Sequence, residues 1–312
     1  MSDPVIDVQG LSHSFGTVTA VDNVSFSVRR GEIFSFLGPN GAGKSTTINV
    51  LTTLLAIQKG RVQVAGHDVA LEPEEVRRAI GIVFQEETLD RDLTVWEILE
   101  FHGRLYSMER GERRRRIDEM IGLVELDAKR DVLVKHLSGG MKRRLEIARG
   151  LMTRPEVLFL DEPTLGLDPQ SRLRVWDYIR QVNREGTTIF LTTHYMDEAD
   201  SLSDRICIID HGRIIASGTS PELKNGLGQD MIYLGTDDDT KAAAVLRSLS
   251  DVRDTRPGFR GLSVLITTDG TKCLPVILEQ LEEAGIEVLS ANLRKPTLDD
   301  VFVHFTGKEI RP

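Results

Sequence analysis

Apolar residues along the chain fall into short runs and helical stripes that predict a mixed α/β protein. Residues 157–160 are continuously apolar, which is typical of a strand buried on both faces. Residues 117–124 carry apolar side chains at helical spacing, whereas residues 261–268 alternate as in a strand with one buried face. No apolar run approaches the roughly 18 to 20 residues that a membrane-spanning helix needs. The pattern indicates a globular protein with buried strands.

A glycine-rich turn, GPNGAGKST, joins an apolar strand to a helix and satisfies the spacing Gly-x-x-x-x-Gly-Lys-Ser in the required strand-then-helix context. The glycines let successive amides point at phosphates, Lys44 supplies a mobile charge, and the Ser45 hydroxyl suits magnesium. An ordinary strand-to-helix turn is the alternative, but it would not also fall in this context by chance. The residues predicted to bind nucleotide are Gly38, Pro39, Asn40, Gly41, Ala42, Gly43, Lys44, Ser45 and Thr46.

An acidic pair follows the strand predicted at residues 157–160. A site that hydrolyses nucleotide needs carboxylates there, and Asp161 and Glu162 supply them. We predict that Asp161 supports the magnesium shell and that Glu162 is the base that orients the attacking water. The alternative is a strand that ends in a solvated acidic turn.

Two more polar residues end predicted strands. His194 follows a β-branched strand and can reach a γ-phosphate, and Gln85 follows an apolar run and offers a neutral oxygen to magnesium or water. Each would more often be a loop or core residue when taken alone. Because they occur together with the other motifs, we predict that both residues belong to the nucleotide site.

A second phosphate cradle is indicated by the stretch LSGGMKRRLE at residues 137–146. Ser138, Gly139 and Gly140 precede a basic, helix-forming run, and unpaired amides at a helix N-terminus attract anions. One nucleotide does not require two such cradles in one chain.

The motifs, in this order, resemble the nucleotide-binding subunits of ABC transporters, over roughly residues 5–223. The resemblance implies a P-loop NTPase fold, α/β, with a mixed sheet core, an antiparallel β subdomain and a helical subdomain at about residues 86–150. It implies that two chains dimerise head to tail, so that Ser138, Gly139 and Gly140 close over the partner's γ-phosphate. By the same resemblance Asp168 lies in the D-loop and crosses the interface.

Some positions match the family pattern less well than these motifs do. Phe15 is the candidate for stacking on adenine, although a plain core aromatic is a nearly equal alternative. Met141 stands where the family usually has glutamine, which puts in doubt a polar contact from this position. The helical subdomain opens with a predicted capping box from Thr94 to Glu97.

The chain divides into an ATP-binding domain at 1–223, a linker at 224–229 and a C-terminal domain at 230–312. Strands and helices of the last part follow the order βαββαβ, which predicts a small α+β ferredoxin-like domain whose second helix begins near Pro275. Thr297 and Asp300 predict a capped final helix with Val301, Phe302 and Phe305 on one face. This tail resembles the daunorubicin-type drug-resistance ATPases, and we expect it to brace the dimer or contact the permease.

Composition narrows the function classes. The 312 residues carry a net charge of −9, which argues against sequence-independent binding of nucleic acid. The basic run at residues 113–116 is interpreted as the solvated end of an amphipathic helix, with a membrane or partner contact as the alternative. Cys207 and Cys273 are expected to be reduced thiols, and the scattered histidines support no transition-metal site. The N-terminal sequence lacks a secretory signal, so we expect a cytoplasmic protein.

Together these features predict an ATP-hydrolysing subunit of an exporter that uses ATP and Mg²⁺. It would form a homodimer that closes on ATP, bind an integral membrane permease, and lie peripherally on the inner face of the cell membrane. A soluble ATPase acting on ribosomes or DNA and an importer subunit are the alternatives. One set of motifs and the absence of a long heptad segment disfavour the soluble class. The cargo stays open between drugs, antibiotics, polysaccharides and lipids.

Overall fold

The computed structural model describes residues 4–258 and 261–306, which form two compact units, one ending at Ser217 and the other beginning at Gly218. The boundary therefore precedes the predicted one at 223. Most of the predicted linker lies in helix α8 (Ser220–Leu227). Thr219 and Glu222 form a capping box that starts this helix, and the polar residues that predicted a linker form its C-terminal end.

A six-stranded sheet in the order β10-β9-β3-β8-β7-β6 is the centre of the first unit. The pairs β6–β7, β7–β8, β3–β8 and β3–β9 are parallel, so the carboxyl ends of these strands meet at one edge. Ligands of parallel sheets bind at that edge. The strands are β3 (Ile33–Leu37), β6 (Ile80–Val83), β7 (Val157–Asp161), β8 (Thr188–Thr193), β9 (Arg205–Asp210) and β10 (Arg213–Gly218).

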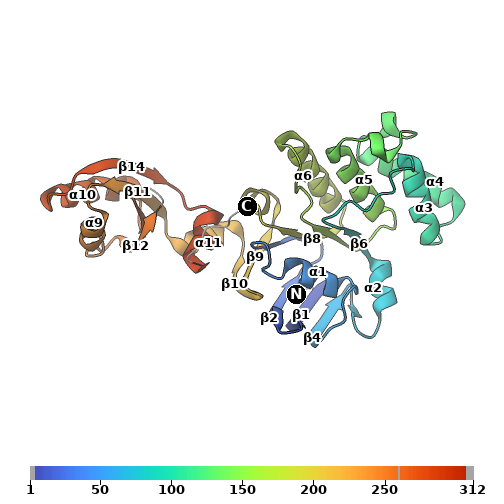
Figure 1. Ribbon diagram of the computed structural model, residues 1–312, viewed down its shortest axis with the longest axis horizontal. Coiled ribbons are helices and arrows are strands. Elements are labelled where there is room, and N and C mark those ends of the chain that lie inside the picture. The colour runs from blue at the N-terminus through green and yellow to red at the C-terminus, as the bar shows by residue number, and fades with distance from the viewer. Residues whose placement is uncertain (1–3, 259–260, 307–312) are drawn as a thin grey trace. The chain divides into compact units, whose positions relative to one another are not determined.

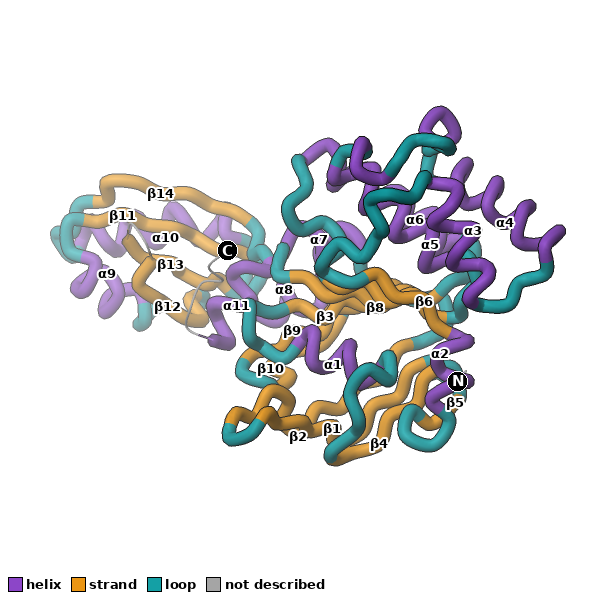
Figure 2. The backbone as a smooth tube through the Cα atoms, turned by 45° about the vertical axis from the view of Figure 1, so that its right-hand side comes forward, coloured by secondary structure: helices purple, strands orange, loops and turns teal. Residues whose placement is uncertain are grey.

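The sheet is buried on both faces, as the apolar runs predicted. Val157 and Phe159 of β7 face one hydrophobic core, while Leu158 and Leu160 face the other. Figure 2 shows helix α1 and an antiparallel sheet on one side of the central sheet, and helices on the other. The antiparallel sheet has the order β2-β1-β4-β5, and this side comprises β1 (Ile6–Phe15), β2 (Val18–Val28), β4 (Lys59–Val64), β5 (His67–Asp68), α1 (Lys44–Leu51) and α2 (Pro73–Ala79).

The helical side of the unit confirms the predicted capping box. The Thr94 side chain accepts from the Glu97 amide, and Glu97 accepts from the Thr94 amide. The helices are α3 (Val95–Leu105), α4 (Arg110–Leu123), α5 (Gly139–Leu151), α6 (Pro169–Arg184) and α7 (Met196–Leu202), with 3₁₀ turns at Asp127–Lys129 and Val134–His136.

The interpretation of residues 113–116 as a solvated helix end is wrong for half of the run. Arg113 donates to both oxygens of Glu100 on α3, and Arg116 donates to the carbonyls of Leu151 and Met152. Both arginines lie on the inward face of α4, three residues apart, whereas the two between them are exposed. The run therefore ties helices together.

The C-terminal unit has the predicted βαββαβ order, with an antiparallel sheet in the order β12-β13-β11-β14. Helix α10 begins at Gly270 rather than near Pro275, because Asp269 caps its N-terminus by accepting from the Thr271 amide. Pro275 therefore lies inside the helix rather than in its first turn. The elements are β11 (Asp230–Thr236), α9 (Asp239–Leu246), β12 (Val252–Gly258), β13 (Gly261–Ile266), α10 (Gly270–Glu283), β14 (Val288–Arg294) and α11 (Leu298–Thr306).

Helix α11 packs against α8 of its own unit. Thr297 and Asp300 bond reciprocally, as predicted, and Val301 and Phe302 are buried. Phe305, predicted on the same face, is instead 51% exposed. Its ring lies 5.2 Å from that of His304, edge to face.

The two cysteines are free and buried, and burial raises the pKa of the Cys207 thiol to about 12. Within residues 4–258 and 261–306, no helix has the length and apolarity needed to cross a membrane.

Candidate functional site

The P-loop, Gly38–Thr46, connects β3 to α1 at the carboxyl edge of the central sheet. A Cβ at position 38 would lie 2.3 Å from the Ile209 carbonyl oxygen, and one at Gly43 would lie 2.4 Å from that of Ala20. Gly43 also has a φ of 102°, which L side chains rarely adopt. In the described chain no side chain caps α1, so its first amides remain available to an anion.

Lys44 is almost fully buried and its ammonium group faces three acceptors. Nζ donates to the carbonyl oxygens of Gly38 at 2.8 Å and Pro39 at 3.1 Å, and it lies 3.1 Å from Glu162 Oε1. Three acceptors match the three donors of an ammonium group. Lys44 is therefore held by its own loop and by the acidic end of β7.

Asp161 ends β7 beside the first turn of α1. The Ser45 hydroxyl donates to Asp161 Oδ1 at 3.4 Å, and the Thr192 hydroxyl donates to the same oxygen. A serine hydroxyl and a carboxylate side by side form an oxygen-only donor set of the kind that Mg²⁺ prefers. The residues present therefore fit magnesium.

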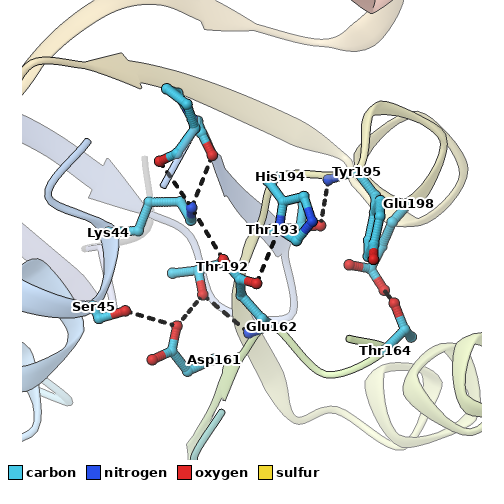
Figure 3. Close-up of polar contacts among 12 residues, drawn as sticks. Lys44, Ser45, Asp161, Glu162, Thr164, Thr192, Thr193, His194, Tyr195 and Glu198 are labelled. Atoms are coloured by element: carbon cyan, nitrogen blue, oxygen red, sulfur yellow. Dashed lines mark hydrogen bonds and ion pairs between the residues drawn. The ribbon is translucent and has the colours of Figure 1, made fainter. Parts of the chain in front are cut away.

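Glu162 lies next to Asp161 with a φ of 47°, in the left-handed region that is uncommon for a residue with a side chain. Its amide donates to the Thr192 carbonyl oxygen at 3.1 Å, and its Oε2 lies 2.9 Å from His194 Nδ1. Figure 3 shows the carboxylate between Lys44 and His194. Backbone strain of this kind is common where a functional side chain must be aimed.

The structure thus brings together five of the residues predicted for the site. Lys44, Ser45, Asp161, Glu162 and His194 form one bonded cluster, drawn in Figure 3. Gln85 is exposed two residues beyond β6. Phe15 lies at the end of β1, 52% exposed, with its ring 4.8 Å from that of His13. An exposed aromatic at that position is free to stack, unlike a core residue.

The signature turn, Ser138–Gly140, opens α5 beside the D-loop. Ser138 and Gly139 are exposed, and the Ser138 hydroxyl accepts from the Met141 amide at 3.3 Å. A Cβ on Gly140 would lie 2.7 Å from Ser171 Oγ at the start of α6. The two predicted trans elements are neighbours within one chain.

Asp168 caps helix α6 in this chain. Its carboxylate accepts from the Ser171 amide at 2.9 Å, and hydrogen bonds from the Ser171 side chain and backbone lower its pKa. The carboxylate stays ionised and fixes the D-loop next to the signature turn.

Three buried polar residues in or next to the site were missed by the sequence interpretation. Thr192 orders both Asp161 and Glu162, and its signal was its position two residues before His194 on a strand. Arg143 donates to the carbonyls of Asp161, Glu162 and Pro163, although the sequence indicated only that it belongs to a basic, helix-forming run. Glu198 accepts from Thr164 and from Trp176, and burial raises its pKa.

Chemically, the cluster offers bare amides and a cation for polyphosphate, an oxygen pair for a divalent cation, and a carboxylate oriented by a histidine. These are the parts that phosphoryl transfer to water requires, because that reaction depends on positioning and charge neutralisation.

Comparison with protein families gives two matches. The ABC transporter family matches residues 21–165, and the C-terminal domain of DrrA1-3-like ATP-binding proteins matches residues 218–306.

Among curated proteins, daunorubicin resistance ATP-binding protein DrrA3 of Streptomyces coeruleorubidus is 43% identical over 100% of this chain and 98% of its own length. Linearmycin resistance ATP-binding protein LnrL of Bacillus subtilis is 37% identical over 98% of this chain and 100% of its own. The similarity thus includes the C-terminal unit.

Solved structures match the first part of the chain. CbiO1 from Clostridium perfringens, part of an ABC transporter complex, has a TM-score of 0.67 at 29% identity and covers 71% of this chain and 91% of its own. A dimeric ATP-binding cassette bound to ADP and Pi has a TM-score of 0.62 at 28% identity and covers 69% of this chain and 98% of its own.

Proposed function

The chain belongs to the ATP-binding subunits of ABC transporters, in the drug-resistance group, and we propose that it powers efflux of a drug-like, antibiotic or lipid-like molecule through a separate membrane permease. It is a transport ATPase of the exporter class. The observation that carries the assignment of roles is the contact of one carboxylate, Glu162, with both Lys44 and His194.

We propose a role for each side chain of the cluster. Lys44 binds the outer phosphates together with the amides of the P-loop. Glu162 accepts the proton of the attacking water, and His194, bonded to Glu162 through Nδ1, orients that carboxylate. Because Oε2 is bonded to His194, the proton of the water would be accepted by Oε1, the oxygen that contacts Lys44.

Ser45, Asp161 and Gln85 are the residues that would hold Mg²⁺. When bound, the ion neutralises charge on the phosphate oxygens. The Thr192 hydroxyl fixes Asp161 from the other side, which keeps the acidic oxygen next to Ser45.

The signature turn acts on the nucleotide of a second copy of the chain. Its exposed Ser138 and Gly139 lie at the N-terminus of α5, and the nearest cation on that helix, Lys142, is engaged with Glu87 at 3.1 Å. A turn of this kind binds an anion through amides alone. Closure of two copies over two nucleotides would place each turn against the other copy's P-loop, with Phe15 stacked on adenine and Asp168 at the interface.

The C-terminal unit matches the DrrA-type domain and is proposed to brace the dimer or contact the permease. Helix α11 packs against α8 of its own unit and has buried residues, so such a contact would use its exposed residues, Phe305 among them. A deletion that tests this role begins at Gly218, because a cut at Gly228 would leave α8 without the α11 residues it packs against.

The first experiment is recovery of a tagged Glu162→Gln protein, with MgATP, from detergent-solubilised membranes of its host. We expect a polytopic permease in stoichiometric amount, and less of it with a tagged Lys44→Ala control that cannot close on nucleotide. The variant therefore reports on the closed, ATP-loaded subunit.

Recovery of ribosomes or nucleic acid in place of a permease would overturn the exporter assignment. It would leave the ATPase intact, provided that the closed dimer still forms.

A further inference from the structure

Arg143 lies on α5, one turn beyond the signature turn, and its side chain is buried. Its guanidinium donates five hydrogen bonds, which matches its five N–H groups. The acceptors are the carbonyl oxygens of Pro163 at 2.7 Å, Asp161 at 2.9 Å, Glu162 at 3.1 Å and Phe84, and Glu146 Oε2 at 2.8 Å.

Three of these acceptors are consecutive carbonyls around Glu162. The backbone of Glu162 has a φ of 47°, a conformation that persists in proteins only where the surroundings hold it. Arg143 supplies the restraint from the carbonyl side, and Thr192 supplies one from the amide side. The direction of the Glu162 carboxylate, toward Lys44 and His194, depends on this backbone.

The same guanidinium also holds the segment that carries Gln85. It donates to the carbonyl of Phe84, and its ion-pair partner Glu146 accepts from the Thr88 amide at 3.0 Å. The Arg143–Glu146 pair is almost fully buried, with side-chain exposures of 8% and 3%. One pair on α5 thus bonds the backbone on both sides of Gln85 and the end of β7.

We propose that Arg143 is a positioning residue for hydrolysis, which aims the Glu162 carboxylate and sets the Gln85 segment in register with it. The proposal rests on Glu162 being the base. It links the two cradles: the helix whose N-terminus serves the second copy's nucleotide also orders the hydrolytic residues of its own chain. A shift of α5 on closure would be transmitted to Glu162 through these hydrogen bonds.

Arg144 provides a matched control. It is the next residue, with the same 8% side-chain exposure, and it donates to the Val124 carbonyl at 2.9 Å and the Tyr178 hydroxyl at 3.2 Å. These partners lie outside the Glu162 cluster. Arg143→Lys and Arg144→Lys therefore change neighbouring arginines that are equally buried, of which only Arg143 bonds the backbone around Glu162.

The test is steady-state ATPase activity of Arg143→Lys, Arg143→Gln, Arg144→Lys and Arg144→Gln in the full chain. For the Arg143 variants we expect kcat to fall about tenfold or more with KM for ATP within about threefold, because misaiming a catalytic group affects the transition state rather than binding. The Arg144 variants should keep kcat within about threefold. A lysine retains the charge but cannot bond all five acceptors.

A double variant tests whether Arg143 acts through Glu162. In the Glu162→Gln background, Arg143→Lys should lower the residual rate by less than about twofold, since residues acting through one another are non-additive. Equal losses in both backgrounds, or equal kcat for the Arg143 and Arg144 variants, would overturn the proposal.

If both Arg143 variants fail to fold while the Arg144 variants fold, Arg143 is structural and the proposal is also overturned. A failure of the proposed function is distinguishable, because Glu162→Gln alone would then turn over normally.

Discussion

The P-loop on α1 and the signature turn on α5 both place glycines and unpaired amides at a helix N-terminus, but their surroundings differ. Gly43 and Lys44 are buried, and Lys44 contacts Glu162 of the same chain. Ser138 and Gly139 are exposed, and Lys142 is paired with Glu87. The cation of the P-loop therefore lies in a buried cluster of its own chain, whereas the exposed signature turn is proposed to act on the nucleotide of a second copy.

The largest expected effect comes from removing the negative charge of Glu162, which pairs with Lys44 of the P-loop. Glu162→Gln should lower ATPase turnover by about 10² or more, the scale of a lost catalytic base, while MgATP still binds and favours the dimer. Steady-state hydrolysis, nucleotide binding and size-exclusion chromatography measure the three quantities. Near-normal turnover would contradict the assignment of Glu162.

Glu198→Gln is the matched control for that change. Burial raises the pKa of Glu198, so a neutral amide that still accepts from Thr164 and Trp176 resembles the native acid. Turnover should stay within about threefold, because Glu198 lies outside the cluster that faces the phosphates. A loss as large as that of Glu162→Gln would mean that any buried carboxyl change disables the unit.

The second-largest effect is expected from a substitution in the signature turn. A Cβ at Gly139 meets only Leu167 Cδ2 at 3.9 Å, and an acidic residue in the first turn favours a helix, so Gly139→Asp should fold normally. Its charge would repel the second copy's phosphates, and like charges about 4 Å apart cost up to about 4 kcal/mol near a surface. We expect ATP-dependent dimerisation and hydrolysis to fall about tenfold or more.

Gly139→Asn separates charge from shape, and it should retain most of the activity. A mixture with Lys44→Ala adds a test of the trans arrangement. A mixed dimer holds one site with an intact P-loop and an intact signature turn, so the mixture should hydrolyse faster than the sum of the two separate variants. If mixing restores nothing, the signature turn does not serve a second chain's nucleotide.

The smallest effect concerns Met141, where the family usually has glutamine. The structure uses its amide, which donates to Ser138, while the side chain packs partly against the hydrophobic core. Met141→Gln should therefore change ATPase activity by less than about threefold, because the phosphate would meet amides of the turn rather than this side chain. A larger gain measured in the same assay would show that a polar contact is missing from the native signature.

The clustering of the site could be predicted because its residues follow parallel strands. Asp161 and Glu162 end β7, His194 follows β8 and the P-loop follows β3, and the ends of neighbouring parallel strands share one edge. Local spacing also predicted the capping box of α3 and the order of the C-terminal unit. These signals lie within a few residues of one another.

What could not be predicted depends on packing between distant segments. Arg143 and Arg116 belong to basic runs that suggest a surface, but each lies on the inward face of its helix and bonds carbonyls from another element. The start of α10 shows competition between two local signals, because Asp269 caps the helix before Pro275 is reached. A single sequence does not rank such signals, since their strengths depend on the folded context.

In the proposed mechanism, the ion pair between Lys44 and Glu162 couples the binding of ATP to the activation of the base. On the proposed roles, Glu162 Oε1 is less able to accept a proton from water while the ammonium group of Lys44 holds it. Phosphate that draws Lys44 away would release this oxygen. Binding of ATP and activation of the base would then be one event, controlled by the residue that recognises the phosphates.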